Sequence, residues 1–222
     1  RGAILDDADQ QMVTLLNKNA TKTAALRMGY ARLLLESDQR DRARTQLQLL
    51  LKEKPGETDA RYALGVITVD DGDLDAAERL FKPLLKGRRS LDAAYQMGRV
   101  EELRKNFPAA LEYYERVSSG SSAIDAAVRR AYVMARLGRV DEAQGIMQGL
   151  REQVPQLAQR FYLTEGDLLL NINQDARALA IYNDALDQFP GDADLLYGRS
   201  LVYEHGGQID LAETDLRTII EA

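Results

Sequence analysis

Small side chains recur along this chain at a nearly constant interval. Six alanines, each within a stretch of helical periodicity, follow one another at spacings of 34, 33, 33, 35 and 34 residues. They are Ala43, Ala77, Ala110, Ala143, Ala178 and Ala212. A period near 34 residues predicts stacked helical hairpins, because each hairpin buries its apolar face only against its neighbours. We therefore expect an all-α, right-handed superhelical solenoid, a fold suited to holding another macromolecule.

One copy of the repeat, residues 59–85, shows what each position requires. A glycine in the first helix (Gly65), a turn glycine (Gly72), a small residue in the second helix (Ala77) and an aromatic one turn later (Phe81) follow in order. This pattern resembles the tetratricopeptide repeat, whose units are two antiparallel helices. Helices about 8–10 Å apart need small side chains at their closest approach. Gly65 and Ala77 are thus predicted packing positions, where leucine would overpack the hairpin.

The same register divides the whole chain into about six repeats plus one extra N-terminal helix. The repeats are predicted at residues 24–55, 58–89, 91–122, 124–155, 159–190 and 193–222. Residues 1–22 fit the second helix of a preceding repeat. Further positions predicted to pack within a repeat or to end one are Gly98, Pro155 and Pro190. Because neither end has a polar capping helix, we expect a fragment of a longer array.

Composition narrows the possible functions. The net charge of −6 argues against general nucleic-acid binding, which needs a basic surface to neutralise phosphates. No run approaches the roughly 20 apolar residues of a membrane span, so we expect no membrane contact by this segment. Cysteine is absent and His205 is the single histidine, which excludes thiolate and multi-histidine metal sites. We predict no metal, no cofactor and no catalytic residue, and hence a protein that is not an enzyme.

The resemblance also implies where a partner would bind. In the family, the first helix of every repeat lines the concave wall, and the register places tyrosines and arginines there. The predicted groove residues are Arg32, Tyr62, Tyr95, Arg99, Arg129, Tyr132, Arg136, Arg160 and Tyr197. Tyrosine and arginine are enriched at binding hot spots. Two alternatives remain open: the tyrosines fill gaps between repeats, and the excess of arginine over lysine reflects the codon bias of a GC-rich genome.

Two longer stretches, residues 29–85 and 195–220, look like the long repeat lipoproteins of Gram-negative outer membranes, of the LbcA adaptor type. This resemblance implies a scaffold that partners a periplasmic carboxyl-terminal processing protease and presents cell-wall hydrolases to it. It also implies a place on the periplasmic face of the outer membrane; otherwise we expect a cytoplasmic protein. The alternative is a regulatory or scaffolding segment of a larger enzyme or transport assembly. Self-association through uncapped ends is a third expectation.

Overall fold

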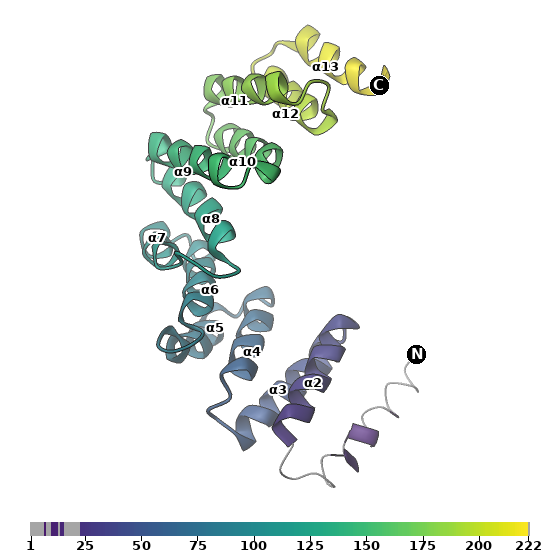
Figure 1. Cartoon of the computed structure of the whole chain (residues 1–222), viewed down its shortest axis with the longest axis vertical. Coiled ribbons are helices and arrows are strands. Elements are labelled where there is room, and N and C mark those ends of the chain that lie inside the picture. Colours follow the sequence, from purple (N-terminus) through teal and green to yellow (C-terminus); the bar gives the residue numbers. More distant parts are fainter. Residues whose placement is uncertain (1–6, 8–9, 13, 16–22, 222) are drawn as a thin grey trace. The chain divides into compact units, whose positions relative to one another are not determined.

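A computed structural model describes residues 7, 10–12, 14–15 and 23–221 (Figure 1). All regular secondary structure within these residues is helical, and no strand occurs among them. The predicted all-α class is therefore confirmed. The chain divides into two compact units, Arg1–Arg104 and Lys105–Ala222, which are described in turn.

Unit 1 is a stack of helices in which each packs against the next along the chain. Its elements are α2 (Thr23–Glu36), α3 (Arg40–Glu53), α4 (Thr58–Asp70), α5 (Leu74–Phe81), a 3₁₀ turn (Lys82–Leu85) and α6 (Ser90–Leu103). Contacts join α2 to α3, α3 to α4, α4 to α5 and α5 to α6. The first helices α4 and α6 also touch each other, which is the arrangement of stacked hairpins.

Unit 2 repeats this arrangement. Its elements are α7 (Phe107–Glu115), α8 (Ala123–Arg136), α9 (Val140–Gln153), a 3₁₀ turn (Pro155–Leu157), α10 (Ala158–Asn171), α11 (Asp175–Gln188), α12 (Ala193–His205) and α13 (Ile209–Glu221). Each helix contacts its successor, and the first helices α8, α10 and α12 contact one another in order. The division into six numbered repeats stays a prediction.

Much of the segment 1–22, predicted as the second helix of a preceding repeat, lies outside the described residues. Of its described residues, Met12 packs against a buried cluster of Tyr30, Leu34 and Ala43. The apolar face of α2 and α3 therefore receives at least one side chain from this segment.

The turn between the two helices of a hairpin has the same backbone conformation throughout the chain. A residue with positive φ lies five positions before each of the six regularly spaced alanines. These residues are Asp38, Gly72, Lys105, Gly138, Asn173 and Gly207, with φ between 57° and 82°. Glycine reaches this left-handed region at little cost and Asn and Asp tolerate it, whereas other residues with a Cβ are strained there. Three of these turns have glycine and two have Asp or Asn, so Lys105 is the residue least suited to the conformation.

The six alanines are all buried, and each is no more than 6% exposed. Gly65 shows the reason for small residues, because a Cβ added there would lie 2.6 Å from the ring of buried Phe81. Gly98 is also buried. Pro155 and Pro190 are exposed and each lies two residues beyond the end of a second helix.

A tyrosine takes the place of Phe81 in unit 2. Tyr182 of α11 is fully buried between Gly166 of α10 and Gly198 of α12, and a Cβ at either glycine would overlap its ring. Its hydroxyl donates a hydrogen bond to Asp167 Oδ1 at 2.7 Å. Burial, together with this carboxylate, raises the pKa of Tyr182 above its usual range. One aromatic side chain therefore joins three helices of unit 2.

The second helix α7 has 9 residues, whereas α3, α9 and α11 have 14 each. The helix α5 has 8 residues but continues directly into the 3₁₀ turn Lys82–Leu85. Residues 116–122, which include the Ser-Ser-Gly-Ser-Ser stretch, form a loop where other repeats continue the helix. Glycine and serine disfavour a helix interior, which accounts for the early end of α7.

Candidate partner-binding face

The predicted groove residue Tyr62 makes three contacts with other side chains of unit 1. Its ring meets buried Phe81 edge-on, with 5.9 Å between the ring centroids. The guanidinium of Arg89 lies over the ring, 4.6 Å from its centroid. Its hydroxyl accepts a hydrogen bond from Gln96 Nε2 at 3.2 Å. Tyr62 is half-buried and therefore offers a side chain that is already ordered.

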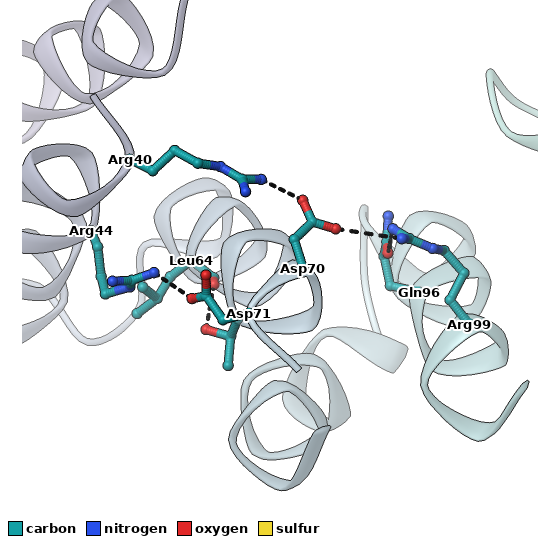
Figure 2. Close-up of polar contacts among 8 residues, drawn as sticks. Arg40, Arg44, Leu64, Asp70, Asp71, Gln96 and Arg99 are labelled. Carbon is teal, nitrogen blue, oxygen red and sulfur yellow. Dashed lines mark hydrogen bonds and ion pairs between the residues drawn. The ribbon is translucent and has the colours of Figure 1, made fainter. Parts of the chain in front are cut away.

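A second predicted groove residue, Arg99, is held by the same glutamine (Figure 2). Arg99 donates to Gln96 Oε1 at 3.0 Å and forms an ion pair with Asp70 Oδ1 at 3.4 Å. The other oxygen of Asp70 accepts from Arg40 of α3 at 2.6 Å. One carboxylate thus lies between two arginines from helices on either side of α4. Tyr62 and Arg99 are brought together through Gln96, which is only 5% exposed.

Beside this group, Asp59 at the start of α4 accepts from two adjacent arginines. Arg89 Nε lies 2.6 Å and Arg88 Nη2 2.7 Å from its oxygens. Burial alone would raise the pKa of Asp59, but the hydrogen bonds and charges of the two arginines outweigh it and lower the pKa below its usual value. Asp59 is therefore a fixed negative charge that holds Arg89 over Tyr62.

The acidic turn between α4 and α5 has four carboxylates, and each has a protein partner. Asp70 pairs with Arg40 and Arg99, and Asp71 pairs with Arg44 (Figure 2). Asp73 accepts from the backbone of Ala76 as the N-cap of α5, and Asp75 pairs with Arg104. These acids hold neighbouring helices together. Among the described residues, no group of three or more His, Cys, Asp or Glu side chains is arranged to hold a metal ion.

The predicted groove residues of unit 2 lie on three successive first helices. Arg129, Tyr132 and Arg136 are three and four residues apart on α8, so they share one side of that helix. Arg129 and Arg136 are exposed, and Arg136 also lies over the ring of Phe107 at 5.5 Å. Two further residues, exposed Arg160 on α10 and 54% exposed Tyr197 on α12, continue the series. In unit 1, Arg32 is exposed on α2 and Tyr95 is half-buried on α6.

The acids that pair with the arginines of unit 1 were not predicted from the sequence. Asp70 lies 30 residues after Arg40 and 29 before Arg99, and Asp59 lies 30 before Arg89. Opposite charges separated by slightly less than one repeat were the available signal. Many arginines of unit 1 therefore form ion pairs between helices. This structural role differs from both partner binding and the codon bias of the genome as explanations for the excess of arginine.

Unit 2 contains a buried ion pair of the same kind. Glu165 of α10 is 1% exposed and pairs with Arg151 of α9, while Gln144 donates to its other oxygen at 3.1 Å. The guanidinium of Arg151 lies 4.2 Å from the centroid of the Tyr162 ring. An open cavity of about 630 Å³ lies between α9, α10 and α11 beside this pair. Because Arg151 is already neutralised, the cavity offers no available cation from this pair.

No helix in the described part of the chain combines the length and apolar character that crossing a bilayer requires. The alternation of first and second helices, with ordered tyrosine and arginine side chains on the first helices, defines a helical-hairpin repeat protein. Sequence models of the tetratricopeptide repeat match residues 29–82, 68–124 and 163–222, and a second tetratricopeptide repeat model matches residues 125–156. The chain belongs to the tetratricopeptide repeat family.

A curated relative is a TPR repeat-containing protein of Pseudomonas aeruginosa. It is 35% identical over 131 residues, which cover 59% of this chain and 22% of the relative. The matched part of the chain thus spans about a fifth of the length of this curated relative.

Three solved structures have the same fold at low sequence identity. A tetratricopeptide repeat protein from Parabacteroides merdae is 16% identical, with a TM-score of 0.70 over 98% of this chain and 86% of that one. The type IV pilus biogenesis factor PilW is 14% identical, with a TM-score of 0.71 over 88% and 91% of the two chains. The pilF protein of Pseudomonas aeruginosa is 16% identical, with a TM-score of 0.63 over 86% and 88%. At these identities the likeness shows the fold alone.

Proposed function

We propose that this chain is a non-catalytic scaffold that binds a protein partner through tyrosine and arginine side chains on its first helices. The observation that carries the proposal is the group formed by Tyr62, Gln96 and Arg99 across α4 and α6. Tetratricopeptide repeat proteins generally bind peptides and proteins, which supports a protein as the partner.

The side chains of this group are already held in place in the free protein, which favours binding. Association costs about 0.5–1.5 kcal/mol for each rotamer-rich side chain that must be immobilised. Tyr62 and Arg99 are already held by ring contacts, hydrogen bonds and an ion pair, so much of that cost is met in the free protein. Both retain exposed surface on the first helices.

Replacing arginines by methionine tests the proposal, because methionine keeps an apolar stem and removes the charge. The test variant carries Arg99→Met and Arg136→Met, both on first helices. The matched control carries Arg40→Met and Arg177→Met, which lie on second helices and lose ion pairs to Asp70 and Asp141, as Arg99→Met loses its pair to Asp70.

Each variant of the intact parent protein is used to retain proteins from a cell-envelope extract, which are quantified by mass spectrometry. We expect the first-helix variant to retain at least about tenfold less of the partner, and the control to match the parent. Equal loss in both variants would show that the arginines act through stability, and equal retention would contradict the first-helix face.

We further propose that the partner is a carboxyl-terminal processing protease of the cell envelope and that the chain delivers protein substrates, cell-wall hydrolases, to it. This proposal places the parent protein on the periplasmic face of the outer membrane. Support comes from the resemblance of residues 29–85 and 195–220 to envelope lipoproteins. Recovery of a protease with its substrates, and of the parent protein in the outer-membrane fraction, is the expected result. Recovery in the cytoplasmic fraction without a protease would contradict it.

Two other roles have their own tests. A regulatory or scaffolding segment of a larger enzyme or transport assembly would be revealed by a catalytic or transport domain in the full reading frame. Self-association is favoured by α13, which exposes Ile209, Leu216 and Ile220 along one side. Sedimentation of the protein and of an Ile220→Lys variant distinguishes a monomer from a complex made through this face.

A further inference from the structure

The short helix α7 leaves an open groove in unit 2. The groove lies between α8 and α9, beside the loop that replaces the missing turns of α7, and has a volume of about 650 Å³. Val117 and Ser118 of that loop form one wall. In a second helix of 14 residues, such as α9, the last turns are helical. In the repeat of α7 a loop replaces those turns, and the groove between α8 and α9 stays open beside it.

The groove lining combines apolar and polar side chains and includes two glycines. Ile124 and Met134 of α8 and Ile146 of α9 line it. Gly145 and Gly149 lie one turn apart on α9 in the same wall. A Cβ at Gly145 would meet nothing within 4 Å, and one at Gly149 would meet only the end of Gln153 at 3.9 Å. The missing side chains at these two positions therefore leave real space.

Among the residues that line the groove, Arg130 is the one cation. Arg130 of α8 makes no hydrogen bond or ion pair with any described residue, and its Nε is buried. A buried donor without a hydrogen bond is costly. The nearby carboxylate of Glu142 is taken by Arg139, which donates to both of its oxygens at 2.7 and 2.6 Å. The charge of Arg130 is therefore available to a ligand.

This groove is separate from the proposed partner-binding face. With about 100° between successive residues of a helix, Arg130 and Met134 project from the side of α8 opposite to Tyr132 and Arg136. A ligand in the groove would therefore leave the first-helix face accessible.

We propose that this groove binds the C-terminal end of a polypeptide whose last residues are apolar. Arginine binds carboxylates through two parallel N–H donors, which would satisfy the Nε of Arg130. A chain end places a carboxylate on the same residue as an apolar side chain, which suits one cation surrounded by isoleucine and methionine. An internal acidic side chain would instead bring two polar stretches of backbone into the groove. The volume lies in the range of ligand sites of about 300–1,000 Å³.

Binding of a defined probe to the whole chain tests the proposal. The probe is a fluorescein-labelled hexapeptide, Gly-Ser-Gly-Ala-Leu-Val, with a free C-terminal carboxylate. The same peptide with a C-terminal amide lacks the terminal charge. A second amidated peptide, in which glutamate replaces the alanine before the leucine, supplies an internal carboxylate instead. Fluorescence anisotropy gives the dissociation constant of each peptide. We expect the free acid to bind at least about tenfold more tightly than either amide.

Two substitutions locate the binding. Arg130→Met should weaken binding of the free acid at least about tenfold and leave the amide unchanged, whereas the control Arg79→Met, at an exposed position of the second helix α5, should leave both unchanged. Gly149→Leu should fill the groove and prevent binding, and the control Gly29→Leu, on an exposed helical position with nothing within 4 Å, should not.

Circular dichroism checks that each variant remains folded, and a Gly145→Leu variant repeats the filling test if Gly149→Leu does not fold. Equal binding of acid and amide, undiminished binding to both Arg130→Met and the filled groove, or no binding of the free acid would overturn the proposal. So would a change of oligomeric state on filling, because the groove would then hold a second copy of the chain. None of these results depends on the variants of the first-helix face, so the two proposals fail separately.

Discussion

Replacement of Gly198 by alanine sets helix propensity against packing. Alanine in a helix interior is favoured over glycine by about 1 kcal/mol. At Gly198, however, the new methyl group would lie 2.5 Å from two ring carbons of Tyr182 and 2.6 Å from its hydroxyl. Overpacking of this kind costs typically about 1–3 kcal/mol. Because Tyr182 is fully buried and hydrogen-bonded to Asp167, its ring has little freedom to move away.

Gly145→Ala supplies the matched control, since a methyl group there meets nothing within 4 Å. We expect Gly145→Ala to raise the free energy of unfolding by up to about 1 kcal/mol. We expect Gly198→Ala to lower it, so that the two variants differ by about 1–3 kcal/mol, the cost of overpacking alone. Urea unfolding followed by far-ultraviolet circular dichroism measures both.

A double variant tests the cause. Tyr182→Leu removes the ring, so adding Gly198→Ala to it should cost less than adding Gly198→Ala to the parent. Tyr182→Phe should give no such relief, because the two close ring carbons remain. If Gly198→Ala were as stable as Gly145→Ala, the close packing of Tyr182 between two helices would be refuted as a constraint.

Three further outcomes follow from contacts described above. Burial would raise the pKa of Asp59, but its arginine partners outweigh burial and lower that pKa. This carboxylate therefore contributes stability above its unfolded pKa of about 3.9, and the contribution is lost as the pH falls through the lower folded pKa. Asp59→Asn should flatten the acid side of a plot of unfolding free energy against pH, and an unchanged slope there would contradict this. Arg151→Met should destabilise the chain by about 3–5 kcal/mol because it leaves Glu165 buried and uncompensated, and adding Glu165→Leu should recover much of the loss in urea unfolding. Lys105→Gly should stabilise the chain by up to about 1 kcal/mol, whereas Gly138→Ala should destabilise it by about 1–2 kcal/mol, because both positions have positive φ; calorimetric melting temperatures that move in the same direction would refute the conformational argument.

The spacing of the alanines predicted the helices because small residues at helix crossings are a steric requirement that leaves a periodic trace. Gly72 likewise indicated a turn. Lys105 carried no such signal, because lysine does not favour positive φ.

The candidate site was harder to predict because arginine serves two purposes. Arg99 and Arg40 look alike in sequence, yet one lies on a first helix and the other on a second helix, and both contact Asp70. Because both arginines pair with the same carboxylate, the ion pair does not distinguish a candidate binding side chain from one that joins helices; the helix that carries each arginine does. Arg130 gave no signal at all, because the lack of a partner for a side chain is not visible in the sequence.

The shared carboxylate of Asp70 has a mechanical consequence. Arg40 of α3 and Arg99 of α6 each pair with one of its two oxygens. A movement of either helix relative to α4 would therefore affect both ion pairs. Ion pairs at a protein surface weaken as salt rises, although charges in direct contact are closer than the screening length of about 8 Å at physiological ionic strength. Added salt should therefore weaken the contacts of α4 with α3 and with α6 together, because both depend on the one carboxylate of Asp70.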